Sequence, residues 1–438
     1  MKSSAGAVWQ IRKGMDRRFR AGHPWVYSNE LVGTPKGVEP GSLVELRDAA
    51  GRFLARGFGN PNSLISFRAL SRDPEVLDPS APESLLKRLQ AAGALRKKLG
   101  LGKVSHRLCF GESDFLPGLV VDCYQMPSGQ VFVAQAHTAG ADRWVKHLLA
   151  VLESMVKSRD GGGAQAWERT SVVLRNDVSV RKLEGLAVDV PQVLKHANGV
   201  DLRQAEIWVL AATASGGSTR DEETRVPFEV DLVEGQKTGF FLDQAANIEL
   251  AVQKLRSYGG SRLKILDLCC YVGQWGTQLG RAFAQRGIQV EVVAVDASKA
   301  ALELAKKNMK AQGVEVQGVQ GDVLKDLTQF SDQSFDLVIS DPPAFIKSRK
   351  DTAVGAHAYL QLATQVFRVL KKGGGVVSCS CSALFEEEVF AQTLAKAALR
   401  NQRSVSWIGR GGQALDHPVL AEFPEGRYLK AWVGVDRE

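Results

Sequence analysis

Residues 266–276, which read L-D-L-C-C-Y-V-G-Q-W-G, constrain the fold of this chain more than any other segment. The apolar residues of 264–268 predict a buried strand that contains an acidic side chain near its end, and a helical pattern begins at Thr277. Gly273 and Gly276 stand in the turn between them, where the absence of a side chain lets a ligand approach the backbone. The segment therefore predicts a nucleotide-like ligand at the carboxyl end of a parallel strand.

Acidic residues at the ends of strands recur along the C-terminal half of the chain. Asp296 and Asp322 follow predicted strands, and Asp341 precedes two consecutive prolines. Strand and helix patterns alternate from residue 263 to about residue 400, which predicts an α/β fold with a doubly wound, mostly parallel sheet. The last two predicted strands would form an antiparallel edge. Because parallel strands end at one edge of the sheet, we expect these acidic side chains to face a common crevice.

Two smaller modules precede this sheet. Short alternating strands over 8–72 predict a small β-barrel, and the mixture of strands and helices over 83–215 predicts an α+β unit without a catalytic constellation. The proline-rich segment 74–82 is typical of a linker, and a flexible break at 214–219 leads into the exposed charged residues 220–223. We therefore expect three domains, over residues 1–76, 83–215 and 222–438.

Charge and cysteine usage narrow the class of protein. The net charge of +8 over 438 residues suggests an acidic partner, with nucleic acid the first candidate and an ordinary basic surface the alternative. The six cysteines show neither a C-x-x-C pair nor zinc-ligand spacing, so we predict no disulfide framework and no metal site. The polar, basic N-terminal segment and the lack of a long apolar run predict a cytoplasmic protein that does not span a membrane.

A basic segment lies near the N-terminus. Residues 12–20 carry five basic side chains and one acidic side chain, among them Arg12, Lys13, Arg17 and Arg18. The segment is either a solvated charged loop or a set of contacts to nucleic-acid phosphates, and the sequence does not separate the two interpretations.

The glycine turn differs from a dinucleotide-binding fingerprint. It has G-x-x-G in place of G-x-G-x-x-G, with Tyr271 inside the turn, and Asp296 stands 20 residues after Gly276. The order of the acidic residues resembles a class I S-adenosylmethionine-dependent methyltransferase. By that resemblance, Asp267, Tyr271 and Gly273 face the methionine part of the cofactor, and Asp296 binds the ribose hydroxyls. Asp322 would bind the adenine amino group, although it could instead cap the following turn.

Two cysteines after Asp341 suggest the chemistry. Carbon 5 of a pyrimidine attacks a sulfonium methyl only after a thiolate has added to carbon 6, which is nucleophilic catalysis by cysteine. Asp341, aimed by Pro342 and Pro343, could bind N3 of the ring. Cys379 and Cys381 lie two residues apart in a predicted strand, and Cys381 is nearer the end where ligands bind. The alternative is that both cysteines are buried small apolar residues.

Several longer strings carry a closer resemblance. The segments 22–28 (G-H-P-W-V-Y-S), 116–122 (L-P-G-L-V-V-D), 235–244 (G-Q-K-T-G-F-F-L-D-Q) and 341–348 (D-P-P-A-F-I-K-S), together with S-C-S at 380–382, resemble the bacterial PUA-domain 23S ribosomal RNA cytosine-5 methyltransferases over nearly the whole chain. The resemblance implies an RNA-binding PUA domain, a central α+β domain and a Rossmann-like methyltransferase domain.

The same resemblance implies large-subunit ribosomal RNA as partner, S-adenosylmethionine as cofactor and Cys381 as nucleophile. It places Lys237 and Lys347 among the RNA-binding residues, and a homodimer is left open. The sequence departs from the family where Ala245 replaces an arginine and where 358–363 reads A-Y-L-Q-L-A. Alternatives to 5-methylcytidine formation are N7 or N2 methylation of guanine on the same fold, and a non-catalytic RNA-binding assembly factor. A nicotinamide dehydrogenase is disfavoured by the incomplete glycine fingerprint.

Overall fold

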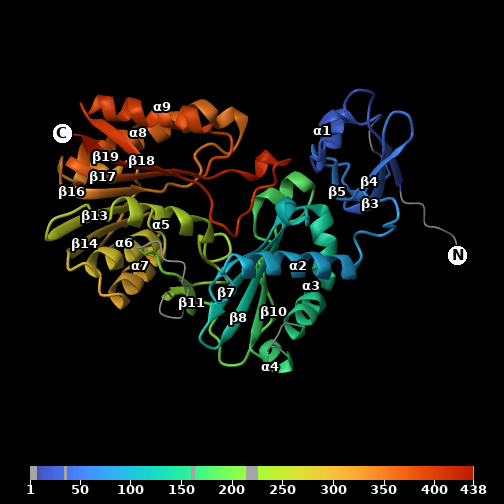
Figure 1. Cartoon of the computed structure of the whole chain (residues 1–438), viewed down its shortest axis with the longest axis horizontal. Coiled ribbons are helices and arrows are strands. Elements are labelled where there is room, and N and C mark those ends of the chain that lie inside the picture. The colour runs from blue at the N-terminus through green and yellow to red at the C-terminus, as the bar shows by residue number, and fades with distance from the viewer. Residues whose placement is uncertain (1–6, 34–36, 159–162, 214–224, 438) are drawn as a thin grey trace. The chain divides into compact units, whose positions relative to one another are not determined.

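The computed structural model describes residues 7–33, 37–158, 163–213 and 225–437 (Figure 1). The predicted break at 214–219 and the charged residues 220–223 lie outside the described residues. The chain divides into two compact units. The first consists of Met1–Trp208, Asp231–Phe240 and Asp416–Gly426, and the second of Val209–Val230, Phe241–Leu415 and Arg427–Glu438.

The first unit begins with a five-stranded sheet in the order β1-β3-β4-β5-β2. In β3 the alternate residues Val44 and Leu46 are fully buried, as the sequence pattern predicted. The β3–β4 turn is held by Asp48, whose Oδ1 accepts hydrogen bonds from the backbone N–H groups of Ala50 and Arg52, both at 2.9 Å. The elements are β1 (Ala7–Gln10), α1 (Arg17–Arg20), β2 (Trp25–Val26), β3 (Ser42–Arg47), β4 (Phe53–Gly59) and β5 (Phe67–Ser71).

A second five-stranded sheet of the first unit has the order β10-β9-β8-β7-β6. The connection from β8 to the parallel strand β9 contains α3, whose first turn is capped by Thr138 through a 3.2 Å hydrogen bond from the Ala141 N–H. The elements are α2 (Pro82–Lys98), β6 (His106–Phe110), β7 (Leu119–Met126), β8 (Gly129–Ala136), α3 (Ala139–Lys157), α4 (Gly163–Glu168), β9 (Thr170–Leu174) and β10 (Gln192–Lys195), and they are followed by β11 (Ala205–Leu210), which is not part of this sheet and crosses the boundary between the two units. This part confirms the predicted mixture of strands and helices.

The sequence patterns of residues 115–122 and 64–70 each predict a strand, and both strands begin later than these patterns suggest. The strand predicted from residue 115 begins at Leu119, because Phe115 has a left-handed backbone (φ 59°) and the chain turns before entering the sheet. The strand predicted from residue 64 begins at Phe67, and Leu64 is 78% exposed in the preceding turn. In both cases a tight turn interrupts an apolar run, and apolar residues alone do not reveal such an interruption.

The second unit is built on a seven-stranded sheet in the order β15-β14-β13-β16-β17-β19-β18. Neighbours from β15 to β17 are parallel, and β19 is antiparallel to both β17 and β18, which confirms the predicted mostly parallel sheet. The elements are β12 (Arg225–Val230), α5 (Ala245–Lys254), β13 (Arg262–Leu268), α6 (Gln274–Ala284), β14 (Gln289–Asp296), α7 (Lys299–Ala311), β15 (Glu315–Gln320), β16 (Phe335–Ser340), α8 (Thr352–Val369), β17 (Leu370–Ser380), α9 (Glu387–Arg400), β18 (Ser404–Gly411) and β19 (Lys430–Arg437).

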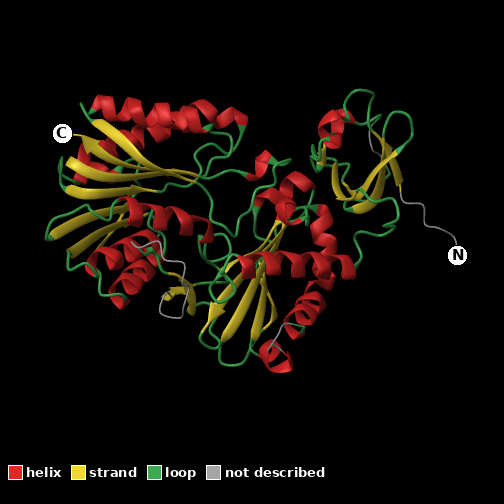
Figure 2. Cartoon of the chain, viewed as in Figure 1, coloured by secondary structure: helices red, strands yellow, loops and turns green. Residues whose placement is uncertain are grey.

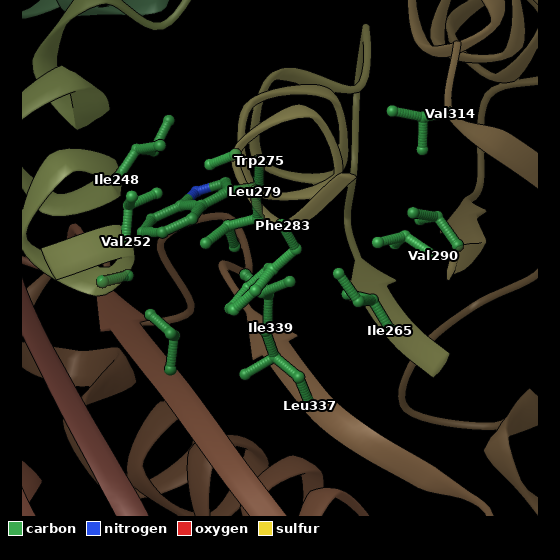
Figure 3. Close-up of a cluster of buried hydrophobic side chains, with 14 of the residues drawn as sticks. Ile248, Val252, Ile265, Trp275, Leu279, Phe283, Val290, Val314, Leu337 and Ile339 are labelled. Carbon is green, nitrogen blue, oxygen red and sulfur yellow. The ribbon is translucent and has the colours of Figure 1, made fainter. Parts of the chain in front are cut away.

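Helices cover both faces of this sheet (Figure 2). On one face α5, α6 and α7 pack against it through a cluster that includes Ile248, Leu279 and Phe283 (Figure 3). On the other face α8 and α9 contribute a separate cluster that includes Val366 and Phe390. Strands with two covered faces bury nearly every side chain, which explains the continuous apolar runs in their sequences.

The order of the strands indicates where a ligand would bind at the edge of the sheet. The chain moves outward from β13 through β14 to β15, and then returns to β16 on the opposite side of β13. In such a sheet, ligands bind at the carboxyl ends of the strands beside this reversal. Within the described part of the chain, every helix is too short or too polar to cross a membrane.

Candidate active site

The turn after β13 has an unusual backbone. Cys269, Tyr271 and Gly273 have positive φ angles of 59°, 49° and 82°, and two of the three carry side chains that ordinarily avoid this region. A Cβ atom on Gly273 would lie 3.0 Å from the Cα of Ala305 in α7. Glycine is therefore needed here for the left-handed turn and for the close approach of α7.

Gly276 allows a close approach inside the protein. A Cβ atom at this position would lie 2.4 Å from the Cε of Met309 and 3.0 Å from Oδ2 of Asp267. The backbone N–H of Gly276 donates a 2.9 Å hydrogen bond to that same oxygen. The residue thus lets α6 close onto the Asp267 carboxylate, a packing role that differs from the direct ligand approach expected from the sequence.

Asp267 lies fully buried near the end of β13. Burial raises its pKa to about 7, and the negative charges of Asp341 and Asp296 act in the same direction. Its Oδ1 has no hydrogen-bond partner among the described residues. A buried carboxylate oxygen without a partner suits a cationic donor, so the site fits the ammonium group of a methionine moiety.

Asp296 ends β14 and organises the glycine turn. Its Oδ2 accepts a 2.9 Å hydrogen bond from the backbone N–H of Tyr271, and its Oδ1 accepts a 2.8 Å bond from the N–H of Ser298. The Tyr271 ring packs edge-on against Phe241, with 5.2 Å between ring centroids. The structure therefore brings together Asp267, Tyr271, Gly273 and Asp296, four residues predicted to bind the cofactor.

Asp322 follows β15 and caps a turn. Its Oδ1 accepts a 3.0 Å hydrogen bond from the N–H of Leu324, and its Oδ2 pairs with Lys325 Nζ at 2.9 Å. The hydrogen bond from Lys325, followed by that from Leu324, lowers the pKa of the carboxyl below its usual value. Turn capping was the alternative that the sequence left open, and the contact to adenine stays a prediction.

Asp341 is held by two side chains that the sequence reasoning did not single out. Its Oδ2 accepts hydrogen bonds from Gln244 Nε2 at 2.8 Å and from Trp275 Nε1 at 3.1 Å. Gln244 in turn accepts a 2.6 Å bond from Asn247 Nδ2. The available signal was position: Gln244 ends the string 235–244, and Trp275 belongs to the glycine turn segment. The network sets the orientation of the carboxylate at the end of β16.

The two cysteines Cys379 and Cys381 differ in burial and in their neighbours. Cys379 is 1% exposed inside the cluster that packs under α5 and α6, and burial raises its pKa well above the usual range. Cys381 follows the last residue of β17 and is partly exposed, with its Sγ 3.9 Å from the carbonyl oxygen of Pro342. Cys381 therefore lies beside the D-P-P motif, whereas Cys379 is a core residue.

The predicted RNA-binding residues are divided between the units. Part of the basic segment is helical rather than a loop, since α1 covers Arg17–Arg20. Arg12, Lys13 and Arg17 are exposed, whereas Arg18 lies over the Tyr27 ring and pairs with Glu30 at 3.6 Å and with Glu425 at 3.7 Å. Exposed Lys237 belongs to the first unit and exposed Lys347 to the second.

Models of two protein families match this chain, one in its N-terminal part and one in its C-terminal part. A model of the PUA-like domain matches residues 10–72, and a model of the methyltransferase domain matches residues 260–422. Ribosomal RNA large subunit methyltransferase I of Photobacterium profundum is 34% identical over 430 residues, which cover 96% of this chain and 97% of that protein. The proteins of the same name from Erwinia tasmaniensis and Aliivibrio fischeri (strain ES114) are 32% and 33% identical over the same shares of both chains.

Solved structures show the same fold. A methyltransferase structure described as complexed with SAH has a TM-score of 0.74 at 16% identity, covering 98% of this chain and all of that one. A structure from Streptococcus mutans, described as that of a SAM-dependent methyltransferase, has a TM-score of 0.72 at 16% identity and the same coverage. The predicted PUA-like module, α/β fold and S-adenosylmethionine cofactor are confirmed, and the chain belongs to the ribosomal RNA large subunit methyltransferase I family of class I S-adenosylmethionine-dependent methyltransferases.

Proposed function

We propose that this enzyme forms 5-methylcytidine in large-subunit ribosomal RNA, with Cys381 as the nucleophile. The observation that carries the proposal is the position of Cys381, which is partly exposed and 3.9 Å from the Pro342 carbonyl oxygen, next to Asp341. Five-position methylation of a pyrimidine requires a thiolate beside the group that holds the ring. The relatives named above carry large-subunit ribosomal RNA in their names, which supports the substrate class.

The reaction would proceed through a covalent adduct. The Cys381 thiolate adds to carbon 6 of cytosine and makes carbon 5 nucleophilic, while the Asp341 carboxyl group shares a proton with N3 of the ring and so stabilises the adduct. When bound, S-adenosylmethionine would supply an electrophilic methyl group to carbon 5 and would leave as the neutral thioether S-adenosylhomocysteine. A base then removes the carbon 5 proton, the bond between carbon 6 and sulfur breaks, and the thiolate is regenerated. Gln244 and Trp275 keep the Asp341 carboxylate aligned with the ring during these steps.

The cofactor residues support the same proposal. Asp267 would hold the methionine ammonium through its unpartnered Oδ1, and Asp296 would accept hydrogen bonds from the ribose hydroxyls while it holds Tyr271 and Ser298. Gly273 leaves the turn backbone open between them, and Asp322 would reach the adenine amino group.

The division into domains over residues 1–76, 83–215 and 222–438 belongs to the proposal, as does RNA binding by exposed basic residues. Phosphate contacts carry no sequence information and require accessible positive charge. The residues proposed for this role are the exposed Arg12, Lys13, Arg17, Lys237 and Lys347, together with Arg18, which is partly buried and pairs with Glu30 and Glu425. The ribosomal substrate implies action in the cytoplasm.

Nucleoside mass spectrometry tests the reaction. The enzyme is incubated with S-adenosylmethionine that carries a heavy methyl group and with ribosomal RNA from cells that lack this gene. Digestion should yield heavy 5-methylcytidine. Heavy methylguanosine would contradict the cysteine mechanism and favour N7 or N2 methylation, whereas label in no nucleoside, with naked RNA or with large-subunit particles, would favour a non-catalytic assembly factor.

A further inference from the structure

Lys430 lies beside the end of β17, where the chain continues into Cys381. Its Cα pairs with that of Ser380 in the antiparallel ladder between β17 and β19. Its Nζ donates a 2.6 Å hydrogen bond to the carbonyl oxygen of Ser382, and the residue is 7% exposed. Lys430 is thus anchored to the residues directly before and after Cys381. Its amino group is held near the proposed nucleophile by contacts that come from outside the D-P-P motif.

The charges around Lys430 couple it to Cys381. Burial lowers the pKa of Lys430 to about 8 and Arg427 acts in the same direction, whereas a negative charge on Cys381 or Glu387 raises it. Tyr359, which packs from α8, also has its pKa raised by burial, and a charge on Cys381 adds to that increase. Glu387 also forms an ion pair with Arg410, with 2.8 Å between Glu387 Oε1 and Arg410 Nη2. Lys430 is therefore a buried lysine whose charge responds to the state of Cys381.

We propose that Lys430 is the positioning residue whose ammonium group stabilises the thiolate form of Cys381. This inference rests on the proposed function, in which Cys381 attacks carbon 6 of cytosine. The thiol proton of Cys381 leaves to solvent, and the positive charge of Lys430, which is held by the Ser382 carbonyl oxygen directly after Cys381, favours the thiolate that remains. The ammonium then stabilises the thiolate before attack and again when the bond to carbon 6 breaks.

The charge on Lys430 is present where it is needed. Burial lowers its pKa to about 8, so most molecules still carry the ammonium group at neutral pH. A cation beside a cysteine lowers the pKa of the thiol below its ordinary value of about 8.5, because the positive charge stabilises the thiolate.

Thiol alkylation tests the proposal without RNA or cofactor. The rate of iodoacetamide reaction at Cys381 is measured across a pH series by peptide mass spectrometry in the full-length protein. In Lys430→Met, which keeps the length of the side chain and removes its charge, the inflection should move up by about one pH unit, so that the rate at neutral pH falls about tenfold. Lys430→Arg, which remains cationic, should keep the lower inflection. An unchanged inflection in Lys430→Met would overturn the proposal.

A reciprocal measurement covers the case in which Lys430→Met does not fold. The pKa of Lys430 is followed by NMR of its labelled ε-carbon in the unmodified protein and in Cys381→Ala. Loss of the neighbouring thiolate should lower the lysine pKa, because coupling between two sites is mutual. Equal pKa values of Lys430 in the unmodified protein and in Cys381→Ala would overturn the proposal. Methylation by Cys381→Ala would overturn the proposed function instead, and the alkylation and NMR results would still stand on their own.

Discussion

The indole Nε1 of Trp275 donates a hydrogen bond to Oδ2 of Asp341 across 3.1 Å. Trp275 belongs to the first turn of α6, which follows β13, and Asp341 directly follows β16. The bond therefore links the glycine turn to the D-P-P motif across the point at which the strand order reverses. The group proposed to bind the base is held in place by the same helix that closes the cofactor turn.

Removing this bond should affect catalysis more than stability. Trp275→Phe keeps an aromatic ring in the cluster under α5 and α6 but removes the N–H donor (Figure 3). Because a hydrogen bond to a charged group contributes about 1.5–3 kcal/mol, kcat/KM for methylation should fall by about tenfold or more while Tm changes little. Phe283→Leu, in the same cluster, is the matched control and should lower Tm without lowering kcat/KM. Equal activity of Trp275→Phe and the wild type would contradict the positioning role.

Asp267 should make stability depend on pH. Its folded pKa of about 7 lies above its ordinary value of 3.8, so the folded chain retains a proton that the unfolded chain releases. The carboxyl should therefore cost the folded state more free energy as the pH rises from about 4 to about 7, with no further change above that. In urea denaturation across this range, Asp267→Asn should gain stability relative to the wild type as the pH rises.

Asp322 provides the control of opposite sign. Its pKa is lowered by Lys325 and Leu324, so its contribution is present above the ordinary carboxyl pKa and is lost as the pH falls. Asp322→Asn should lose stability relative to the wild type at neutral pH, and by a small amount because the side chain is partly exposed. Parallel pH profiles for Asp267→Asn and the wild type would refute the raised pKa of Asp267.

Asp296 should be required for cofactor binding. Asp296→Ala removes the acceptor of the Tyr271 and Ser298 N–H groups together with the proposed ribose contact, and the dissociation constant for S-adenosylmethionine should rise by about tenfold or more, as measured by calorimetry. Asp296→Asn keeps one carbonyl oxygen, so its dissociation constant should lie between those of the wild type and Asp296→Ala. Native affinity in Asp296→Ala would exclude the ribose role.

Cysteine substitution should separate the two candidate thiols. Cys381→Ala should abolish 5-methylcytidine formation because the adduct at carbon 6 cannot form. Cys379→Ala changes a buried residue of similar size and should cost about 1 kcal/mol of stability while turnover is retained. The assay is nucleoside mass spectrometry with heavy-methyl cofactor. Turnover by Cys381→Ala would favour methylation on nitrogen.

The exposed basic residues of the N-terminal segment should contribute to RNA affinity through phosphates. Charge reversal at Lys13 and Arg17 should weaken binding and reduce the slope of log K against log salt by about 1 for each phosphate that the protein no longer neutralises. Lys157→Glu, on the exposed end of α3, is a matched reversal outside the segment and should have less effect. Identical salt slopes for the wild type and both reversals would rule out phosphate contact.

Local patterns in the sequence were enough to predict most of the fold. The alternation of apolar strands with amphipathic helices predicted the parallel sheet, and the acidic residues at strand ends predicted the side of the sheet that carries Asp267, Asp296 and Asp341. These features depend on residues that are close in sequence, so periodicity and turn chemistry reveal them. The strand start at Leu119 follows the Pro117-Gly118 turn, whose signal outweighs the apolar run around it, and the start at Phe67 follows a bend that continues through the apolar residues Leu64 and Ile65.

The site itself depended on interactions between distant segments. Alternation left Cys379 and Cys381 equivalent, and only the position of Cys381 nearer the strand end favoured it in the sequence. The packing of helices over β17 shows the difference in burial, since Cys379 is buried and Cys381 is partly exposed. Trp275 reaches Asp341 from 66 positions away, and Lys430 reaches Ser382 from 48 positions away through the antiparallel edge of the sheet. The sequence determined which elements form and where their polar ends lie. The tertiary structure decided which side chains meet there, because burial and hydrogen bonding depend on neighbours that no local pattern identifies.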